Sequence, residues 1–214
     1  MFIRASSTRT QKRDDIQLLR AYSVLIVILY HSGLGYVSHG FLGVDIFFVI
    51  SGYLITGHIR RDISSGVFSL GEFYAKRIKR LLPSAYVTIL MCLCAAPFIL
   101  SGAEARDFGN QIIGAVTFIA NYTLKNQTGY FEGVADLKPL LHMWSLSVEE
   151  QFYFLIPPLL LIIPFRAHVF LLSIITIVSY FGCWYAKANP ETVFYTLPYR
   201  AWELGLGALA TFFV

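Results

Sequence analysis

Long apolar runs alternate with short polar clusters along this sequence. Predominantly apolar stretches occupy about residues 18–37, 41–57, 81–100, 141–165 and 169–186, and a sixth begins near Tyr195. These lengths approach the roughly 20 residues that a helix needs to cross the hydrocarbon core of a bilayer. The pattern predicts an all-α fold, a polytopic transmembrane helix bundle with about five to six spans.

Residues 102–140 interrupt this pattern because apolar and polar positions mix there. The stretch "FGNQIIGAVTFIANY" is apolar enough to lie at the membrane interface or dip into the bilayer, and its polar ends leave spanning open. Residues 1–15 are polar and lack the apolar core of a cleaved signal peptide. We therefore divide the chain into a cytoplasmic N-terminus, 1–15, and a transmembrane domain, 16–214, whose first span is an uncleaved anchor.

Composition and charge support a membrane protein. Only 14% of the 214 residues are charged and 56% are hydrophobic, whereas soluble domains carry roughly a quarter charged residues. Basic residues flank the first three apolar runs: Arg4, Arg9, Lys12, Arg13, Arg20, Arg60, Arg61, Lys76, Arg77, Lys79 and Arg80. Because such residues favour the cytoplasmic side, we expect the N-terminus and residues 58–80 in the cytoplasm and no nucleic-acid partner. The three cysteines lie in apolar segments without metal-ligand spacing, so we expect no metal site.

The first apolar run places two titratable side chains on one helix face. In "RAYSVLIVILYH", Arg20 and His31 are eleven positions apart, which corresponds to about three helical turns and a rise of about 16 Å. Arg20 then lies at the cytoplasmic boundary and His31 lies well inside the bilayer. An ionisable group at such depth is a candidate for function.

The second run, "GFLGVDIFFVISGYLIT", aligns Asp45, Gly52 and Thr56 on one face, with Ser51 beside them. If the hairpin turns midway between Asp45 and His31, the two side chains lie at similar depth on neighbouring helices. A carboxylate that orients a neutral histidine makes that histidine a general base. The alternative is a buried hydrogen-bonded pair that only locks the hairpin.

A basic motif precedes the third run. In "FYAKRIKRLLPS", Arg77 and Arg80 lie three positions apart, on one side of an expected short helix, and Pro83 is placed to begin the third span. Guanidinium groups bind phosphate oxygens well, which makes the pair a candidate anion site. Membrane topology alone is the alternative explanation, because basic residues are expected beside a cytoplasmic helix end.

The fourth run, "LLHMWSLSVEEQFYFLIPPLLL", is rich in polar groups. Three of them align on one helix face, with Tyr153 a further turn along: His142, Ser145 and Glu149. Glu149 and Glu150 are adjacent, so at least one of them needs a polar partner inside the membrane. The alternative, which explains the motif equally well, is a hydrogen-bond cluster that only locks helices, with Trp144 as an interfacial anchor.

The last motif is "YRAWELGLGALA". Arg200 and Glu203 can pair at a spacing of three, and Gly205 and Gly207 permit close approach of another helix. We expect this motif to serve packing.

These motifs occur in a specific order and with specific gaps over residues 14–210. Together they closely resemble the acyltransferase-3 family of integral membrane O-acyltransferases, which includes the O-antigen and peptidoglycan O-acetylases of bacteria. The resemblance implies a multi-pass protein of the bacterial inner membrane. It also implies transfer of an acyl group, commonly acetyl, from cytoplasmic acetyl-CoA or another acyl-CoA to a hydroxyl of a cell-envelope polysaccharide or glycolipid, lipopolysaccharide included.

The resemblance also suggests roles for individual residues. Arg20 and His31 match positions considered essential in the family, and Arg77 and Arg80 match the pair associated with the donor. Further candidates match motif positions whose individual roles are open: Asp45, Ser51, Trp144, Ser145 and Glu149. Family members resemble bundles of about ten helices, so we expect this chain to be the amino-terminal part of such a protein.

These expectations combine into one mechanistic hypothesis. The three arginines hold the phosphates of acyl-CoA, and the pantetheine arm threads along the first helix toward His31. His31, oriented by Asp45, takes the proton of the acceptor hydroxyl, while Ser51 or Ser145 stabilises the oxyanion. A two-step route, in which His31 or a serine first carries the acyl group, stays open. A proton-coupled transporter and an inactive membrane fragment are the alternatives, because buried ionisable groups also describe a proton relay.

Overall fold

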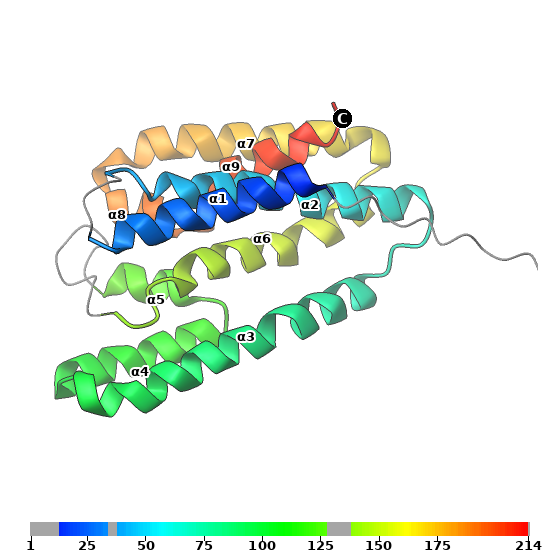
Figure 1. Ribbon diagram of the computed structural model, residues 1–214. Coiled ribbons are helices and arrows are strands. Elements are labelled where there is room, and N and C mark those ends of the chain that lie inside the picture. Colours follow the sequence, from blue (N-terminus) through cyan, green and yellow to red (C-terminus); the bar gives the residue numbers. More distant parts are fainter. Residues whose placement is uncertain (1–12, 34–37, 128–137, 214) are drawn as a thin grey trace, which may run out of the picture.

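The computed structural model describes residues 13–33, 38–127 and 138–213. The helices are α1 (Asp14–His31), α2 (Leu42–Ser64), α3 (Leu70–Ile99), α4 (Gly102–Val116), α5 (Ala120–Asn126), α6 (Met143–Ile162), α7 (His168–Tyr185), α8 (Pro190–Tyr195) and α9 (Leu197–Ala210), with short 3₁₀ turns η2 (Phe165–Ala167) and η3 (Ala186–Ala188) (Figure 1). No strand occurs in these described ranges. The prediction of an all-α fold is confirmed for them.

Three helical stretches among the described residues are long and apolar enough to cross a membrane. They are Leu42–Ser64, Leu70–Ile99 and Phe165–Tyr185. The 15 residues of α4 and the seven of α5 fall short of the roughly 20 that a spanning helix needs. The expected total of five to six spans, and the orientation of the chain, stay predictions.

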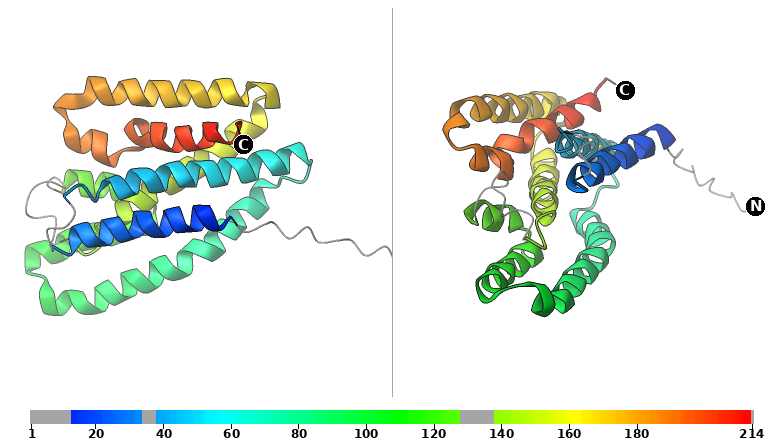
Figure 2. Two further views of the ribbon diagram at one scale, coloured as in Figure 1. Left: turned by 45° about the horizontal axis from the view of Figure 1, so that its top comes forward. Right: turned by 60° about the vertical axis from the view of Figure 1, so that its left-hand side comes forward.

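The bundle is organised around α6. Figure 2 shows α6 between α2 and α9 on one side and α4 and α5 on the other, with α1 outside α2 and α7 outside α9. The chain starts α1, ends α2, starts α3 and ends α9 at the same end of the bundle (Figure 1). The basic residues of residues 58–80 therefore gather at one end, as the charge pattern predicted.

The helix α3 begins well before the apolar run that predicted it. The Ser69 side chain caps its start by accepting a hydrogen bond from the Glu72 backbone N–H. The helix then continues through the basic motif to Ile99 with Pro83 inside it. The expectation of a short helix for the basic motif was wrong, because one 30-residue helix holds both the motif and the third apolar run. Proline removes a single backbone donor, and the hydrogen bonds on either side keep the helix continuous.

Glycines set the contact between α2 and α9. A Cβ atom built on Gly207 would collide with the Val49 backbone carbonyl, and one built on Gly52 would collide with the Leu204 carbonyl. On the same face of α2, the Thr56 side chain is fully buried. The prediction that small residues in the last motif permit close helix approach is confirmed.

Candidate active site

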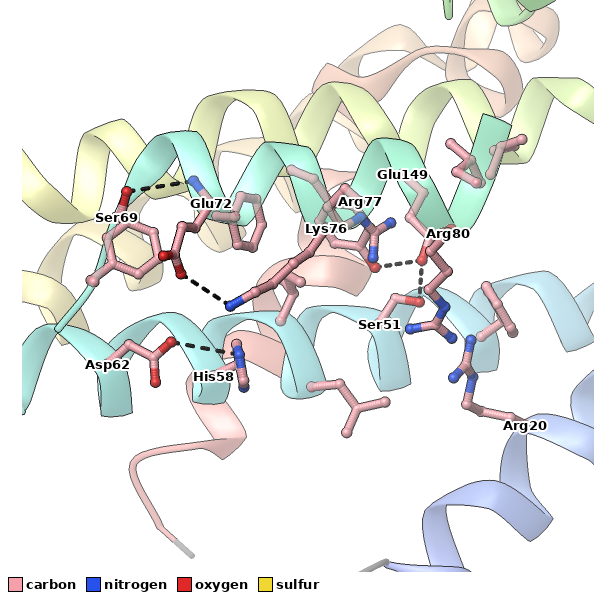
Figure 3. Close-up of a pocket in the computed structure, with 18 of the residues that line it drawn as sticks. Arg20, Ser51, His58, Asp62, Ser69, Glu72, Lys76, Arg77, Arg80 and Glu149 are labelled. Atoms are coloured by element: carbon pink, nitrogen blue, oxygen red, sulfur yellow. Dashed lines mark hydrogen bonds and ion pairs between the residues drawn. The ribbon is translucent and has the colours of Figure 1, made fainter. Parts of the chain in front are cut away.

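A cavity of about 570 Å³ opens between α1, α2, α3 and α6. Three arginines line it: Arg20 from α1, and Arg77 and Arg80 from α3. The structure thus brings to one cavity three residues that lie up to 60 positions apart. The close-up in Figure 3 shows Arg20 and Arg80 extending toward the same part of the cavity.

Arg20 and Arg80 are cations without an acidic partner among the described residues. The Arg20 guanidinium lies 5.2 Å from the centre of the Phe47 ring, which also lines the cavity. Such a contact leaves the N–H donors of the guanidinium available. Two arginines whose donors face one cavity make that cavity attractive to a phosphate or another anion.

Arg77 differs from Arg80. It forms a salt bridge to Glu150 on α6, and its guanidinium lies 3.9 Å from the centre of the Tyr153 ring. Both charged side chains of the salt bridge are largely buried, with 19% and 13% of their surfaces exposed. Arg77 therefore connects α3 to α6, whereas Arg80 remains available to a ligand.

A hydrogen-bonded group of three side chains lies in the same cavity. The Ser51 hydroxyl on α2 and the Tyr153 hydroxyl on α6 both donate to Oε1 of Glu149. All three side chains are buried and line the cavity. The sequence left open which glutamate of the adjacent pair points inward, and the structure gives each a partner: Glu149 has the two hydroxyls and Glu150 has Arg77.

Other polar residues of the cavity pair with each other. His58 Nε2 lies 3.5 Å from Asp62 Oδ2, and Lys76 Nζ lies 3.2 Å from Glu72 Oε2. Both pairs join positions i and i+4 of one helix, so this spacing was visible in the sequence. None of the four was a candidate from the sequence, because only the fold brings α2 and α3 together there.

His31 and Asp45 are not partners, and the prediction that they form a pair was wrong. Gly43 packs against the Ser23 carbonyl, and Arg20 lies over Phe47, so Asp45 is level with the stretch of α1 between Arg20 and Ser23. His31 is eight residues beyond Ser23, which corresponds to roughly 12 Å along α1. The hairpin does not turn midway between the two side chains, because the glycines of α2 fix a different register.

His31 lies at the exposed end of α1, where Nδ1 is 2.9 Å from the Val27 carbonyl oxygen. It is not among the described residues that line the cavity. The expected juxtaposition of His31 with the donor site is therefore absent from this structure. Its catalytic role stays a prediction.

Asp45 belongs to a second charged cluster. Arg200 Nη1 on α9 donates to Asp45 Oδ1 at 3.0 Å and to Glu203 Oε1 at 2.6 Å. The predicted pairing of Arg200 with Glu203 is confirmed. The third member was missed, because Asp45 is 155 positions away and no spacing rule connects α2 to α9.

Two candidates of the fourth run lie elsewhere than expected. Ser145 Oγ donates to the His142 carbonyl at 3.3 Å and does not line the cavity, so an oxyanion role at the donor site is not supported. Trp144 is only 4% exposed and packs against the rings of Phe48 and Phe194. The interpretation of Trp144 as an interfacial anchor was wrong, because α6 is central and turns this side chain into the core.

The fold and the cavity define a helical membrane protein in which arginines, a serine and a glutamate line one cavity. The family model described as "Acyltransferase domain" matches residues 13–214. The chain belongs to this acyltransferase family, as the sequence motifs predicted.

Curated relatives agree with this assignment. The chain is similar to the O-acetyltransferase OatA of Staphylococcus aureus (strain NCTC 8325 / PS 47), with 33% identity over 91% of this chain and 33% of the relative. It is 32% identical to "Putative membrane-bound transacylase BcsY" of Komagataeibacter xylinus over 92% of this chain and 50% of the relative. "Putative O-acetyltransferase SACOL0978" of Staphylococcus aureus (strain COL) is 40% identical over 66% of this chain and 24% of the relative. The chain thus spans between about a quarter and a half of these relatives, and no solved structure matches it.

Proposed function

We propose that this protein is an O-acyltransferase of the bacterial inner membrane. It transfers an acyl group, most simply acetyl, from cytoplasmic acyl-CoA to a hydroxyl of a cell-envelope polysaccharide or glycolipid. The family assignment and the names of the relatives support acyl transfer to oxygen. The donor and the acceptor are our inference from the site and from the charge pattern.

The main support for acyl-CoA as the donor is the pair of arginines Arg20 and Arg80. Both face one cavity without an acidic partner among the described residues. Coenzyme A carries phosphate groups at one end and the thioester at the other, so an anionic end and a reactive end must be bound together. The volume of about 570 Å³ lies within the range of about 300–1,000 Å³ typical of small-molecule sites. Phosphates near Arg20 and Arg80 leave the hydroxyl group of Ser51 and the carboxylate of Glu149 beside the rest of the donor.

His31 keeps a separate task in this proposal. It lies toward the opposite end of α1 from Arg20, which is the side where an envelope acceptor would approach. A neutral imidazole there can take the proton of an acceptor hydroxyl, and general-base assistance is worth about 10²–10⁴ in rate. Asp45 does not orient His31 in this proposal, because Asp45 pairs with Arg200.

The test uses membranes that contain the protein expressed from its complete gene. We expect these membranes to release free CoA thiol from acetyl-CoA. Arg20→Ala and Arg80→Ala should each raise the donor KM by about 10- to 100-fold, the equivalent of one lost charge-assisted hydrogen bond. Lys79→Ala is the matched control: Lys79 is exposed on the same helix, next to Arg80, and does not line the cavity.

A truncated donor sharpens the test. Acetyl-pantetheine has the thioester but no nucleotide, so it should be a poor donor whose KM is insensitive to Arg20→Ala. Equal sensitivity of both donors would contradict phosphate binding by this arginine. A transporter would release no CoA thiol at all, and proton-linked uptake by vesicles would then replace our proposal.

A further inference from the structure

The arrangement of Ser51, Glu149 and Tyr153 goes beyond what donor binding requires. Ser51 and Glu149 are 98 positions apart, yet the serine hydroxyl donates directly to Glu149 Oε1. The exposed fractions of Ser51 and Glu149 are 4% and 7%. A hydroxyl that donates to a buried carboxylate has its oxygen lone pairs free for a bond to carbon, and the carboxylate is placed to receive its proton.

Glu149 is held by more than the serine. The Tyr153 hydroxyl donates to the same oxygen, Oε1. Arg77 is engaged with Glu150 and lies over the Tyr153 ring. A nucleophile, a base within hydrogen-bond reach and a third group that orients the base are the general features of an activated hydroxyl.

Two hydroxyls contact the base, and the surroundings favour the serine as nucleophile. The Arg77 guanidinium covers one face of the Tyr153 ring at 3.9 Å. Ser51 instead lies toward the part of the cavity into which Arg20 and Arg80 extend (Figure 3). A donor held by these arginines therefore meets Ser51, while Tyr153 acts as a positioning residue for Glu149.

We propose that Ser51 accepts the acyl group from the donor and carries it as an ester before transfer. This inference rests on the proposed function. In the first step the Ser51 Oγ–H proton passes to the Glu149 carboxylate while Oγ bonds to the thioester carbonyl carbon. The carbon–sulfur bond then breaks, its electron pair goes to sulfur, and the thiolate takes the proton from Glu149 and leaves as free CoA thiol.

The second step returns the protein to its starting state. The acceptor hydroxyl passes its proton to the Glu149 carboxylate while its oxygen bonds to the carbonyl carbon of the ester; the bond from that carbon to Ser51 Oγ then breaks, and Oγ takes the proton back from Glu149. In this two-step route Glu149, not His31, is the base for the acceptor hydroxyl, because His31 is eleven residues from Arg20 along α1, about 16 Å, and does not line the cavity that holds Ser51; His31 then serves the binding of the acceptor. Donor and acceptor then do not have to meet in one place at one time.

The experiment follows radiolabelled acetyl groups on the protein in membranes without acceptor. Wild-type protein incubated with labelled acetyl-CoA should retain label in the peptide that contains Ser51, as an oxygen ester that resists neutral hydroxylamine. Ser51→Ala should retain none. Ser51→Cys should retain label as a thioester, which neutral hydroxylamine removes, and this change in chemistry identifies the atom that carries the group.

Control variants separate a chemical role from a structural one. Ser23 is buried on α1, and its hydroxyl donates to the Leu19 carbonyl at 2.7 Å, outside the cavity; Ser23→Ala should label like the wild type. Tyr153→Phe keeps the ring under Arg77 and removes one hydrogen bond to Glu149. It should lower kcat and leave the donor KM unchanged, whereas loss of folding would remove donor binding as well.

The outcomes distinguish this inference from the proposed function. If wild-type membranes release CoA and acetylate an acceptor, and Ser51→Ala does so at the same rate, the acyl-serine is wrong and the proposed function stands. Label found on Tyr153 or His31 would also overturn it. If wild-type membranes release no CoA from acetyl-CoA, the proposed function itself has failed.

Discussion

Asp45 on α2 and Arg200 on α9 are joined by a hydrogen-bonded ion pair of 3.0 Å across 155 positions of the chain. Arg200 also donates to the fully buried Glu203, so one guanidinium faces two carboxyl groups. Buried ionisable groups need such partners. The aromatic rings of Trp144 and Phe194 lie beside Arg200. Asp45 therefore adds an ion pair to the contact that glycines set between α2 and α9, and its partner is Arg200, not His31.

We predict that Arg200→Met is far more destabilising than Asp45→Asn. The first change leaves two carboxyl groups in the bundle without a cation, a loss of about 3–5 kcal/mol. The second leaves the Arg200–Glu203 pair intact and removes one hydrogen bond, about 1–3 kcal/mol. The free energy of unfolding of the two variants in one detergent measures the difference. Equal losses of unfolding free energy would contradict a central role for Arg200 in the cluster.

Gly207→Ala should weaken the packing of α2 against α9. The added methyl group would collide with the Val49 carbonyl, a backbone atom that cannot rotate away, and overpacking of this kind costs about 1–3 kcal/mol. Gly109→Ala is the matched control: Gly109 lies inside α4, and nothing lies within 4 Å of the new methyl group. There the helix should gain about 0.5–1 kcal/mol. Thermal unfolding measures both variants: the melting temperature should fall for Gly207→Ala and rise for Gly109→Ala.

The Arg77–Glu150 salt bridge should show charge coupling. Arg77→Glu or Glu150→Arg alone places like charges together in a largely buried contact between α3 and α6 and should reduce both stability and CoA release. The double variant restores opposite charges and should recover most of the stability. A double-mutant cycle measured by unfolding gives the coupling energy. Additive losses would mean that Arg77 serves the ligand, like Arg80, and not the fold.

The start of α4 should respond to acid. Hydrogen bonds from the Ser101 hydroxyl and backbone N–H lower the pKa of Glu104, which lies outside the three spans. The folded state then binds fewer protons than the unfolded chain between the two pKa values, so this contribution to stability is present above the ordinary pKa of glutamate, about 4.3, and is lost as pH falls through the lowered value. Amide hydrogen exchange in the first turn of α4 measures it. Glu104→Gln should remove the pH dependence, and an unchanged pH profile in that variant would contradict the assignment.

Local patterns predicted the helices and the shared faces of several polar residues. The i, i+3 spacing of Arg77 and Arg80 predicted one shared helix face, and both side chains line the cavity; the glycines of "GLGALA" correctly indicated close helix packing. Such features depend on the geometry of one helix, which the sequence states directly. The depth of a residue along a helix also follows from its position.

Contacts between different helices could not be predicted from the sequence in the same way. The relative depth of His31 and Asp45 depends on where glycines let α1 and α2 approach, and the burial of Trp144 depends on α6 being central. Neither is encoded in the spacing within one segment. The hydrogen bond between Ser51 and Glu149 could not be predicted for the same reason. Each residue was a candidate by itself, and only the fold makes them partners.

His31 offers the sharpest test of how the two ends of α1 cooperate. Since it lies outside the cavity that holds Ser51, we expect His31→Ala to leave the first step intact and to weaken the binding of the acceptor, so that only the second step slows. In a single turnover with acetyl-CoA, the variant should release one burst of CoA thiol per protein and accumulate the labelled ester at Ser51, while acceptor acetylation nearly stops. Ser32→Ala, next to His31 at the end of α1, should behave like the wild type. If His31→Ala abolishes the burst as well, the imidazole acts on the donor itself, and the separation of the two sites in this structure would not describe the working state.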